Sequence, residues 1–157
     1  MKKFCNLTQE QAIARFNSIF AGTISYNLHI NLHKGKNYDG HLEMEFNAKN
    51  PDSIFLEYLG NNFRYEHINQ KQVPLQDDSH EYLRDNGYLK IPTDLLFYGS
   101  ENKNHLKINF DNSYHTDGWG IHSNIDIDGT QYIYTQNVPH YFSKICPVFD
   151  QPDLKAR

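Results

Sequence analysis

The stretch from Thr23 to His33, TISYNLHINLH, most constrains the fold because its side chains alternate strictly between apolar and polar. Successive side chains of a β-strand point to opposite faces, so this segment has one apolar and one polar face. The segment KGKNYDG follows as a turn, and a second alternation then places Leu42, Met44 and Phe46 between polar residues. The two alternating runs predict a β-hairpin.

A short helix is predicted before the first strand, over about residues 8–21. Thr8 and Gln11 have the spacing of a capping box, and apolar side chains recur at helical spacing as far as Gly22, at Ala12, Ile13, Phe16, Ile19 and Phe20. From residue 23 onward, short strands are readable at residues 53–59, 63–68, 87–91, 105–110 and 131–135. We expect a mainly β fold of antiparallel sheets with a short N-terminal helix.

Composition narrows the functional class. The 157 residues suit one ordinary domain, and a net charge of -4 with a pI near 6.1 offers no basic excess to attract nucleic acid. The N-terminal MKKFCNLTQEQ has no apolar run, and the chain has no apolar stretch of spanning length, so we expect a cytoplasmic protein without a membrane partner. Cys5 and Cys146 are then expected to be reduced, and the sequon at Asn6 unused.

Several local patterns resemble metal or catalytic motifs, and each lacks an essential part. His29 and His33 share a strand face but lie about 13 Å apart, too far to bind one metal. His80-Glu81 opens like H-E-x-x-H, but Arg84 takes the place of the second histidine. Asp126–Gly129 resembles the start of a calcium loop without its closing glutamate, which favours a hairpin turn. Neither cysteine has a recognisable nucleophile context.

Three segments in order resemble the N-terminal domain of zinc aminopeptidases of the aminopeptidase N family: residues 7–32, residues 118–136 and residues 147–156. The second segment has the family's G-x-G-x-H turn, a D-G pair and Y-x-Y-T-Q; the third, PVFDQPDLKA, resembles F-P-C-F-D-[EQ]-P-x-x-K-A. The matching residues are Gly118, Gly120, His122, Asp128, Gly129, Tyr132, Tyr134, Thr135, Gln136, Pro147, Phe149, Asp150, Gln151, Pro152, Lys155 and Ala156. Departures at Asn137, Val138 and Phe142-Ser143 bear on specificity rather than on fold.

The resemblance implies a β-saddle domain of sandwich-like antiparallel sheets. This domain packs against a catalytic domain and closes one side of its active-site cleft. It assigns Gln136 to binding of the substrate's N-terminal residue, a role that suits an amide because it offers both an acceptor for a protonated amine and donors for a carbonyl. The family's zinc ligands, catalytic glutamate and G-x-M-E-N exopeptidase loop lie downstream of residue 157. Residues 1–157 are therefore expected to form a single, C-terminally incomplete domain without catalytic residues or metal of its own, with zinc in the full-length parent.

Two other functions stay open. The runner-up is a stand-alone, catalytically dead module that binds or assembles through an open sheet edge. A third reading is a β domain that binds carbohydrate through its tyrosine and asparagine side chains, which rests on composition alone. Whether the reading frame continues into G-x-M-E-N and H-E-x-x-H distinguishes the first function from the second.

Overall fold

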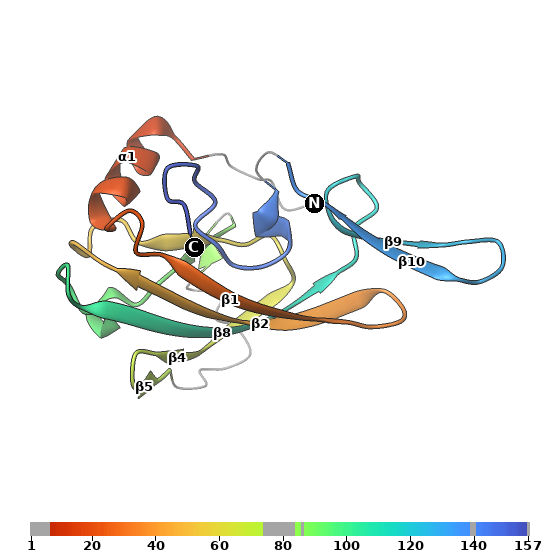
Figure 1. Ribbon diagram of the computed structural model, residues 1–157, viewed down its shortest axis with the longest axis horizontal. Helices are drawn as coiled ribbons and strands as arrows, with labels where there is room; N and C mark the ends of the chain where they lie inside the picture. Colours follow the sequence, from red (N-terminus) through yellow and green to blue (C-terminus); the bar gives the residue numbers. More distant parts are fainter. Residues whose placement is uncertain (1–6, 74–83, 86, 139–140, 157) are drawn as a thin grey trace.

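The computed structural model describes residues 7–73, 84–85, 87–138 and 141–156. The predicted class is confirmed, because the fold is mainly β, its named strand pairs are antiparallel, and one short α-helix lies near the N-terminus (Figure 1). The elements are α1 (Gln9–Ser18), β1 (Ser25–Leu32), β2 (Asn37–Asn47), β3 (Phe55–Glu57), β4 (Asn62–Ile68), β5 (Lys71–Gln72), β6 (Arg84–Asp85), β7 (Tyr88–Lys90), η2 (Thr93–Leu95), β8 (Lys103–Ser113), β9 (Gly120–Ile125), β10 (Gln131–Gln136) and η3 (Phe142–Lys144).

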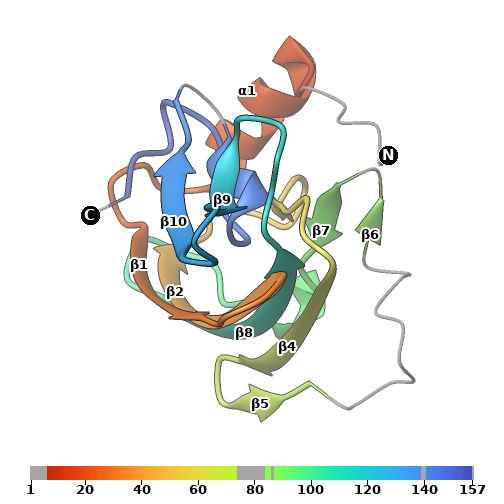
Figure 2. The same ribbon diagram turned by 90° about the vertical axis from the view of Figure 1, so that its right-hand side faces the viewer.

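The main sheet has five strands in the order β1-β2-β8-β4-β5 and curves into an arc (Figure 2). The predicted hairpin of β1 and β2 is present, with Ser25 opposite Glu45 and Leu32 opposite Tyr38. Its turn is shorter than KGKNYDG, because β2 already begins at Asn37 and Tyr38 is buried.

The inner face of the arc carries the core. On β2 and β8 the burial of side chains alternates along the whole strand, and Leu42, Met44 and Phe46 are completely buried, as predicted. The outer face is polar, so the sheet is covered on one side and solvated on the other. Leu32 departs from the pattern: it ends β1 with 53% of its surface exposed.

The helix is shorter than predicted. Its capping box is confirmed, because the Gln11 N–H donates to Thr8 Oγ1 and the Thr8 N–H donates to Gln11 Oε1. It ends at Ser18 rather than near residue 21, because Ile19 is extended and bridges to Ala48 while the Phe20 N–H donates to the Asn47 carbonyl. Pairing with the end of β2 thus overrides the helical periodicity of this segment.

Two smaller sheets complete the fold. β3, β7 and β6 form one of them, and β9 with β10 forms a hairpin that projects from the body of the domain (Figure 1). Of the strands, β5, β6 and β9 have no counterpart in the sequence prediction. Within the described ranges, no helix combines the length and apolar character needed to cross a membrane.

Candidate functional site

Gln136 is the last residue of β10 and its side chain is exposed. It lies opposite Gly120 of β9, and Tyr134 lies opposite His122. Alternate residues of a strand share a face, so Tyr132, Tyr134 and Gln136 form one row along the projecting hairpin. None of the described residues forms a hydrogen bond with the side-chain amide of Gln136, which is therefore available to a ligand. Its substrate-binding role stays a prediction.

The glycine opposite Gln136 allows a close approach at the base of the hairpin. Gly120 has a φ of +88°, and a Cβ at this position would lie 2.8 Å from Cδ2 of His115. His115 bridges to the start of β9, where its N–H donates to the Ile121 carbonyl at 2.8 Å. Both the backbone conformation and the contact with His115 therefore require glycine here.

Replacing Gly120 with alanine should reduce the free energy of unfolding by about 1 to 2 kcal/mol from the left-handed backbone alone, and by more because Cβ displaces His115. Gly118→Ala is the matched control: Gly118 has a φ of +95° and open space around its Cβ position. Urea titrations of both variants measure the effect. Equal losses in the two variants would contradict a specific contact between position 120 and His115.

His122 supports the row that ends at Gln136. Its side chain is buried, and its ring stacks on Tyr134 with centroids 5.0 Å apart and an interplanar angle of 12°. Its Nε2 has no hydrogen-bond partner among the described residues. The imidazole thus acts as a packing platform that sets the orientation of Tyr134, the neighbour of Gln136 in the row.

Two contacts join the turn before β9 to η3. Lys144 forms an ion pair with Asp117, and the rings of Trp119 and Tyr141 stack with centroids 4.4 Å apart. Burial and the nearby Lys144 ammonium lower the pKa of His115, which favours a neutral imidazole between the turn and η3. The ion pair and the ring stacking therefore both hold the hairpin base against the segment at residues 141–144.

The segment that follows η3 packs into the core. Phe149 is buried and meets the Phe46 ring edge-on at 5.4 Å. Val148 exchanges two backbone hydrogen bonds with Glu57, at 2.8 and 3.0 Å. Cys146 is a buried free thiol whose pKa is raised by burial, so it is poorly suited to act as a nucleophile.

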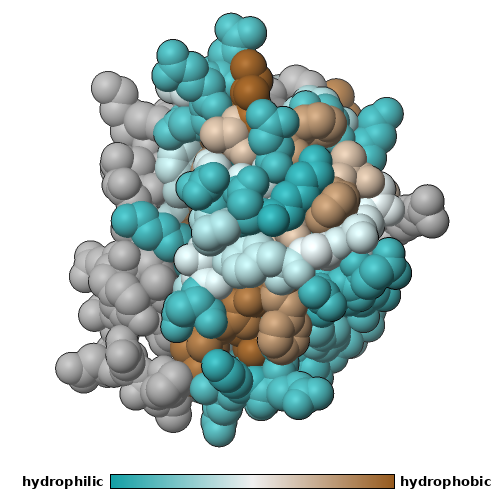
Figure 3. Space-filling model, turned by 90° about the vertical axis from the view of Figure 1, so that its left-hand side faces the viewer, coloured by the Kyte–Doolittle hydropathy of each residue, from teal (hydrophilic) through white to brown (hydrophobic). Residues whose placement is uncertain are grey.

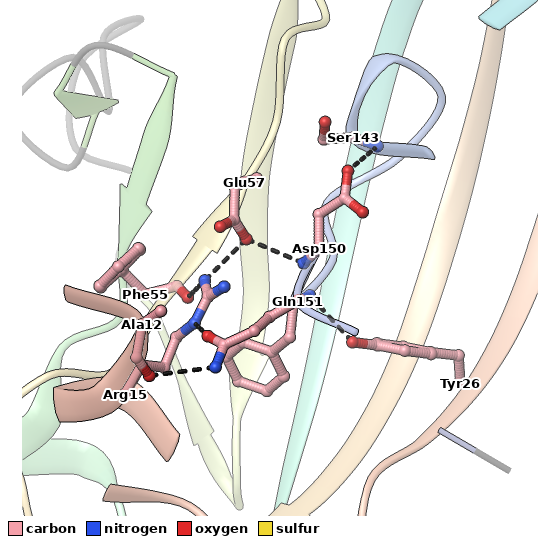
Figure 4. A network of polar contacts seen from close by, with 9 residues as sticks. Ala12, Arg15, Tyr26, Phe55, Glu57, Ser143, Asp150 and Gln151 are labelled. Carbon is pink, nitrogen blue, oxygen red and sulfur yellow. Dashed lines mark hydrogen bonds and ion pairs between the residues drawn. The ribbon is translucent and has the colours of Figure 1, made fainter. Parts of the chain in front are cut away.

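A buried polar network joins α1, β3 and this C-terminal segment (Figure 4). Arg15 Nη1 donates to Glu57 Oε2 at 2.7 Å, and Arg15 Nε donates to Gln151 Oε1 at 2.9 Å. Gln151 Nε2 in turn donates to the Ala12 carbonyl, and the Asp150 N–H donates to Glu57 Oε2 at 2.9 Å. The network fixes Asp150-Gln151, the matching F-D-[EQ]-P residues, against the helix.

The charges of this network are fully desolvated. The side chains of Arg15 and Glu57 are 0% and 3% exposed, and within the described residues neither Arg15 Nη2 nor Glu57 Oε1 has a hydrogen-bond partner. Burial raises the pKa of Glu57, and the adjacent Arg15 opposes that rise. The sequence did not reveal this pair, although Arg15 precedes Ser18 by three residues and both lie on the buried face of the helix.

The other sequence candidates lie away from this site. His29 and His33 are exposed on the outer sheet face, as predicted; His29 stacks on His41, and His33 pairs with Asp39. Asp126–Gly129 forms the predicted hairpin turn, in which the Gly129 N–H donates to the Asp126 carbonyl. The remaining predictions concern Cys5, Asn6 and His80-Glu81, which lie outside the described residues.

No residue set for a metal emerges from the described part of the chain, where no three His, Cys, Asp or Glu side chains gather at one place. Zinc in proteins is held by three or four such side chains, so the described residues do not fit a zinc centre.

Exposed apolar side chains concentrate on the hairpin and the segment after it. These residues are Ile125, Ile127, Tyr132, Tyr134, Val138 and Phe142. The opposite end of the molecule, where α1 lies, is hydrophilic over much of its surface and has one hydrophobic patch in the lower half of the view (Figure 3). The projecting hairpin, which carries Gln136 at its base, thus has the character of an interaction surface.

Comparison with known proteins identifies the family of this domain. The family model of the Peptidase M1 N-terminal domain matches residues 22–157. No curated protein matches the chain. The matched residues include the β1–β2 hairpin, the hairpin that carries Gln136 and the Phe149–Gln151 segment. The chain therefore belongs to the Peptidase M1 N-terminal domain family.

Proposed function

We propose that the chain is the substrate-side portion of a zinc aminopeptidase that removes N-terminal residues from peptides. The observation that carries the proposal is the Gln136 side-chain amide, which is exposed and has no partner among the described residues, at the end of β10 and the base of a projecting hairpin. An uncharged amide accepts a hydrogen bond from the peptide's α-ammonium group without competing for the metal. The peptide N-terminus is thus the proposed ligand of Gln136.

The catalytic domain of the parent is the proposed partner of the hairpin end. Ile125 and Ile127 are 71% and 104% exposed at the tip of the hairpin, so their burial against another domain is favourable. We propose that this contact aligns the row of Tyr132, Tyr134 and Gln136, which runs from near the tip to the base of the hairpin, with the bound peptide. The ion pair of Asp117 with Lys144 and the stacking of Trp119 on Tyr141 hold the hairpin base, as a binding site requires.

Zinc, the metal-activated water and the catalytic glutamate are assigned to the catalytic domain of the parent. The chain itself contributes a binding residue and a wall of the cleft. We propose that the parent acts in the cytoplasm, with neither nucleic acid nor membrane as a partner, because this chain has a net charge of -4 and no apolar stretch of spanning length.

The test is to express the full reading frame and the 157-residue chain separately, and to assay both with aminoacyl arylamides. The parent should hydrolyse them and lose activity to a zinc chelator, whereas the chain should be inactive and hold no stoichiometric zinc. A reading frame that ends without G-x-M-E-N and H-E-x-x-H would instead favour the stand-alone binding module.

A further inference from the structure

The projecting hairpin of β9 and β10 contacts the β1–β2 turn, residues 33–36, far from its own base. Both hairpins extend to the same side of the molecule (Figure 1). The contact is made by Gln131, which begins β10 and lies opposite Ile125, whereas Gln136 ends the strand at the base. Gln131 therefore joins two hairpins that belong to different sheets.

Both ends of the Gln131 side-chain amide take part in this contact. Its Oε1 accepts from the Gly35 N–H at 3.0 Å, and its Nε2 donates to the Gly35 carbonyl at 2.8 Å. Nε2 also donates to Ser123 Oγ of β9 at 2.5 Å, which uses its second N–H group. A primary amide has a donor and an acceptor side by side, so it pairs with Gly35 as a neighbouring peptide group would.

The β1–β2 turn is itself fixed by a second side chain, Tyr114. The Tyr114 hydroxyl accepts from the His33 N–H at 3.1 Å and donates to the His33 carbonyl at 2.9 Å. Its ring packs against that of the buried Tyr38, with centroids 5.5 Å apart. The turn is therefore connected to the core, and Gln131 binds to a fixed part of the main sheet.

Two separate supports set the direction of the projecting hairpin. The ion pair of Asp117 with Lys144 holds its base. Gln131 holds the other end of β10, about 17 Å from Gln136 at ~3.4 Å per residue. Ile133 packs against the core between these points, but apolar packing is non-directional. The Gln131 hydrogen bonds therefore decide the angle between the hairpin and the main sheet.

We propose that Gln131 is a positioning residue: by binding Gly35 it keeps the row of Tyr132, Tyr134 and Gln136 aligned with the peptide. Without this support the hairpin pivots at its base, and the outer part of the row moves most. The role in peptide binding rests on the function proposed for Gln136. The Gln131–Gly35 contact does not depend on that function, because both residues belong to this chain.

Spin labels on the 157-residue chain measure the direction of the hairpin. Labels are attached at Ile127→Cys, where the native side chain is 104% exposed at the tip, and at Arg64→Cys on β4. A Cys5→Ser background leaves Cys146, which is buried. Double electron–electron resonance should give one narrow distance distribution. Gln131→Met keeps the side-chain length without its hydrogen bonds and should broaden the distribution about twofold or more.

Two further variants complete the distance experiment. Gln136→Met makes the same change at the other end of β10, where the amide has no partner among the described residues, and should leave the distribution unchanged. Gly35→Ala acts from the other side of the contact and should broaden it, because Gly35 has a φ of +112° and a side chain there strains the turn. Circular dichroism and melting curves check that each variant is folded.

In the full-length parent, Gln131→Met should reduce kcat/KM about tenfold, mostly through a higher KM, because a loosened hairpin binds the peptide less well. A narrow, unshifted distribution in both Gln131→Met and Gly35→Ala would overturn the proposal. A broadened distribution with unchanged kcat/KM would overturn the role in peptide binding. Failure of the proposed function looks different, because the parent would then be inactive or Gln136→Ala would have unchanged kinetics.

Discussion

Replacing Arg15 with methionine is expected to lower the free energy of unfolding by about 3 to 5 kcal/mol, because it leaves the Glu57 carboxylate buried without its counter-ion. Methionine retains much of the apolar stem, so the loss reports the missing charge rather than a cavity. Arg15 also holds Gln151 and the Phe55 carbonyl, and its guanidinium lies over the Phe55 ring. Guanidinium chloride titration at neutral pH measures the loss.

The matched control is the double variant Arg15→Met/Glu57→Gln, which removes both charges and should recover part of the stability. The pH dependence provides a second check. The folded-state pKa of Glu57 is already raised by burial and rises further without Arg15. The Glu57 contribution in Arg15→Met is therefore most favourable below the ordinary carboxyl pKa and is lost as the pH rises through the raised value. A neutral-pH loss under about 1 kcal/mol would contradict a functional ion pair.

Gln136→Ala in the full-length parent should reduce kcat/KM roughly tenfold to a hundredfold. The reason is the loss of one hydrogen bond to a charged amine, about 1.5 to 3 kcal/mol of transition-state stabilisation. Folding should be nearly unaffected, because the side chain is exposed and contributes no hydrogen bond within the described part of the domain. Steady-state kinetics with aminoacyl arylamides and a thermal melt measure both quantities.

Thr135→Ala is the control for this prediction. Thr135 is exposed on the same strand, next to Gln136 and on the other face of the hairpin, so its removal should leave kcat/KM within about twofold. If Gln136→Ala had unchanged kinetics, or if both variants lost activity equally, the role assigned to the amide would be wrong.

Strands with one buried face could be predicted from the sequence because their period of two survives in the fold. Burial alternates along β8 and along β2 as far as Phe46, and β1 alternates between partly buried and exposed residues from Tyr26 to Asn31. β9 escaped prediction because it follows a turn with two glycines in the left-handed region and has no clear alternation. The end of α1 was misplaced because Ile19 pairs with Ala48, a contact between residues distant in sequence.

The candidate site also contains residues that could be predicted from the sequence and residues that could not. Gln136 and the turn at Gly118 and Gly120 were found by resemblance, because they belong to short contiguous motifs. The Arg15 network was not found, since its members come from a helix, a strand and a loop separated by up to 136 residues. A lone arginine in an amphipathic helix usually lies on the solvated face. Only the fold shows that Arg15 donates hydrogen bonds to Glu57 and Gln151.

The central claim is that Gln136 binds the amino terminus of a peptide substrate. The most direct measurement is a crystal structure of the full-length parent with a peptide or amino-acid inhibitor in its active site. The account predicts that the Gln136 side-chain oxygen lies within hydrogen-bond distance of the α-amine, about 3 Å. A bound amine satisfied entirely by other residues, with Gln136 turned toward solvent, would contradict it.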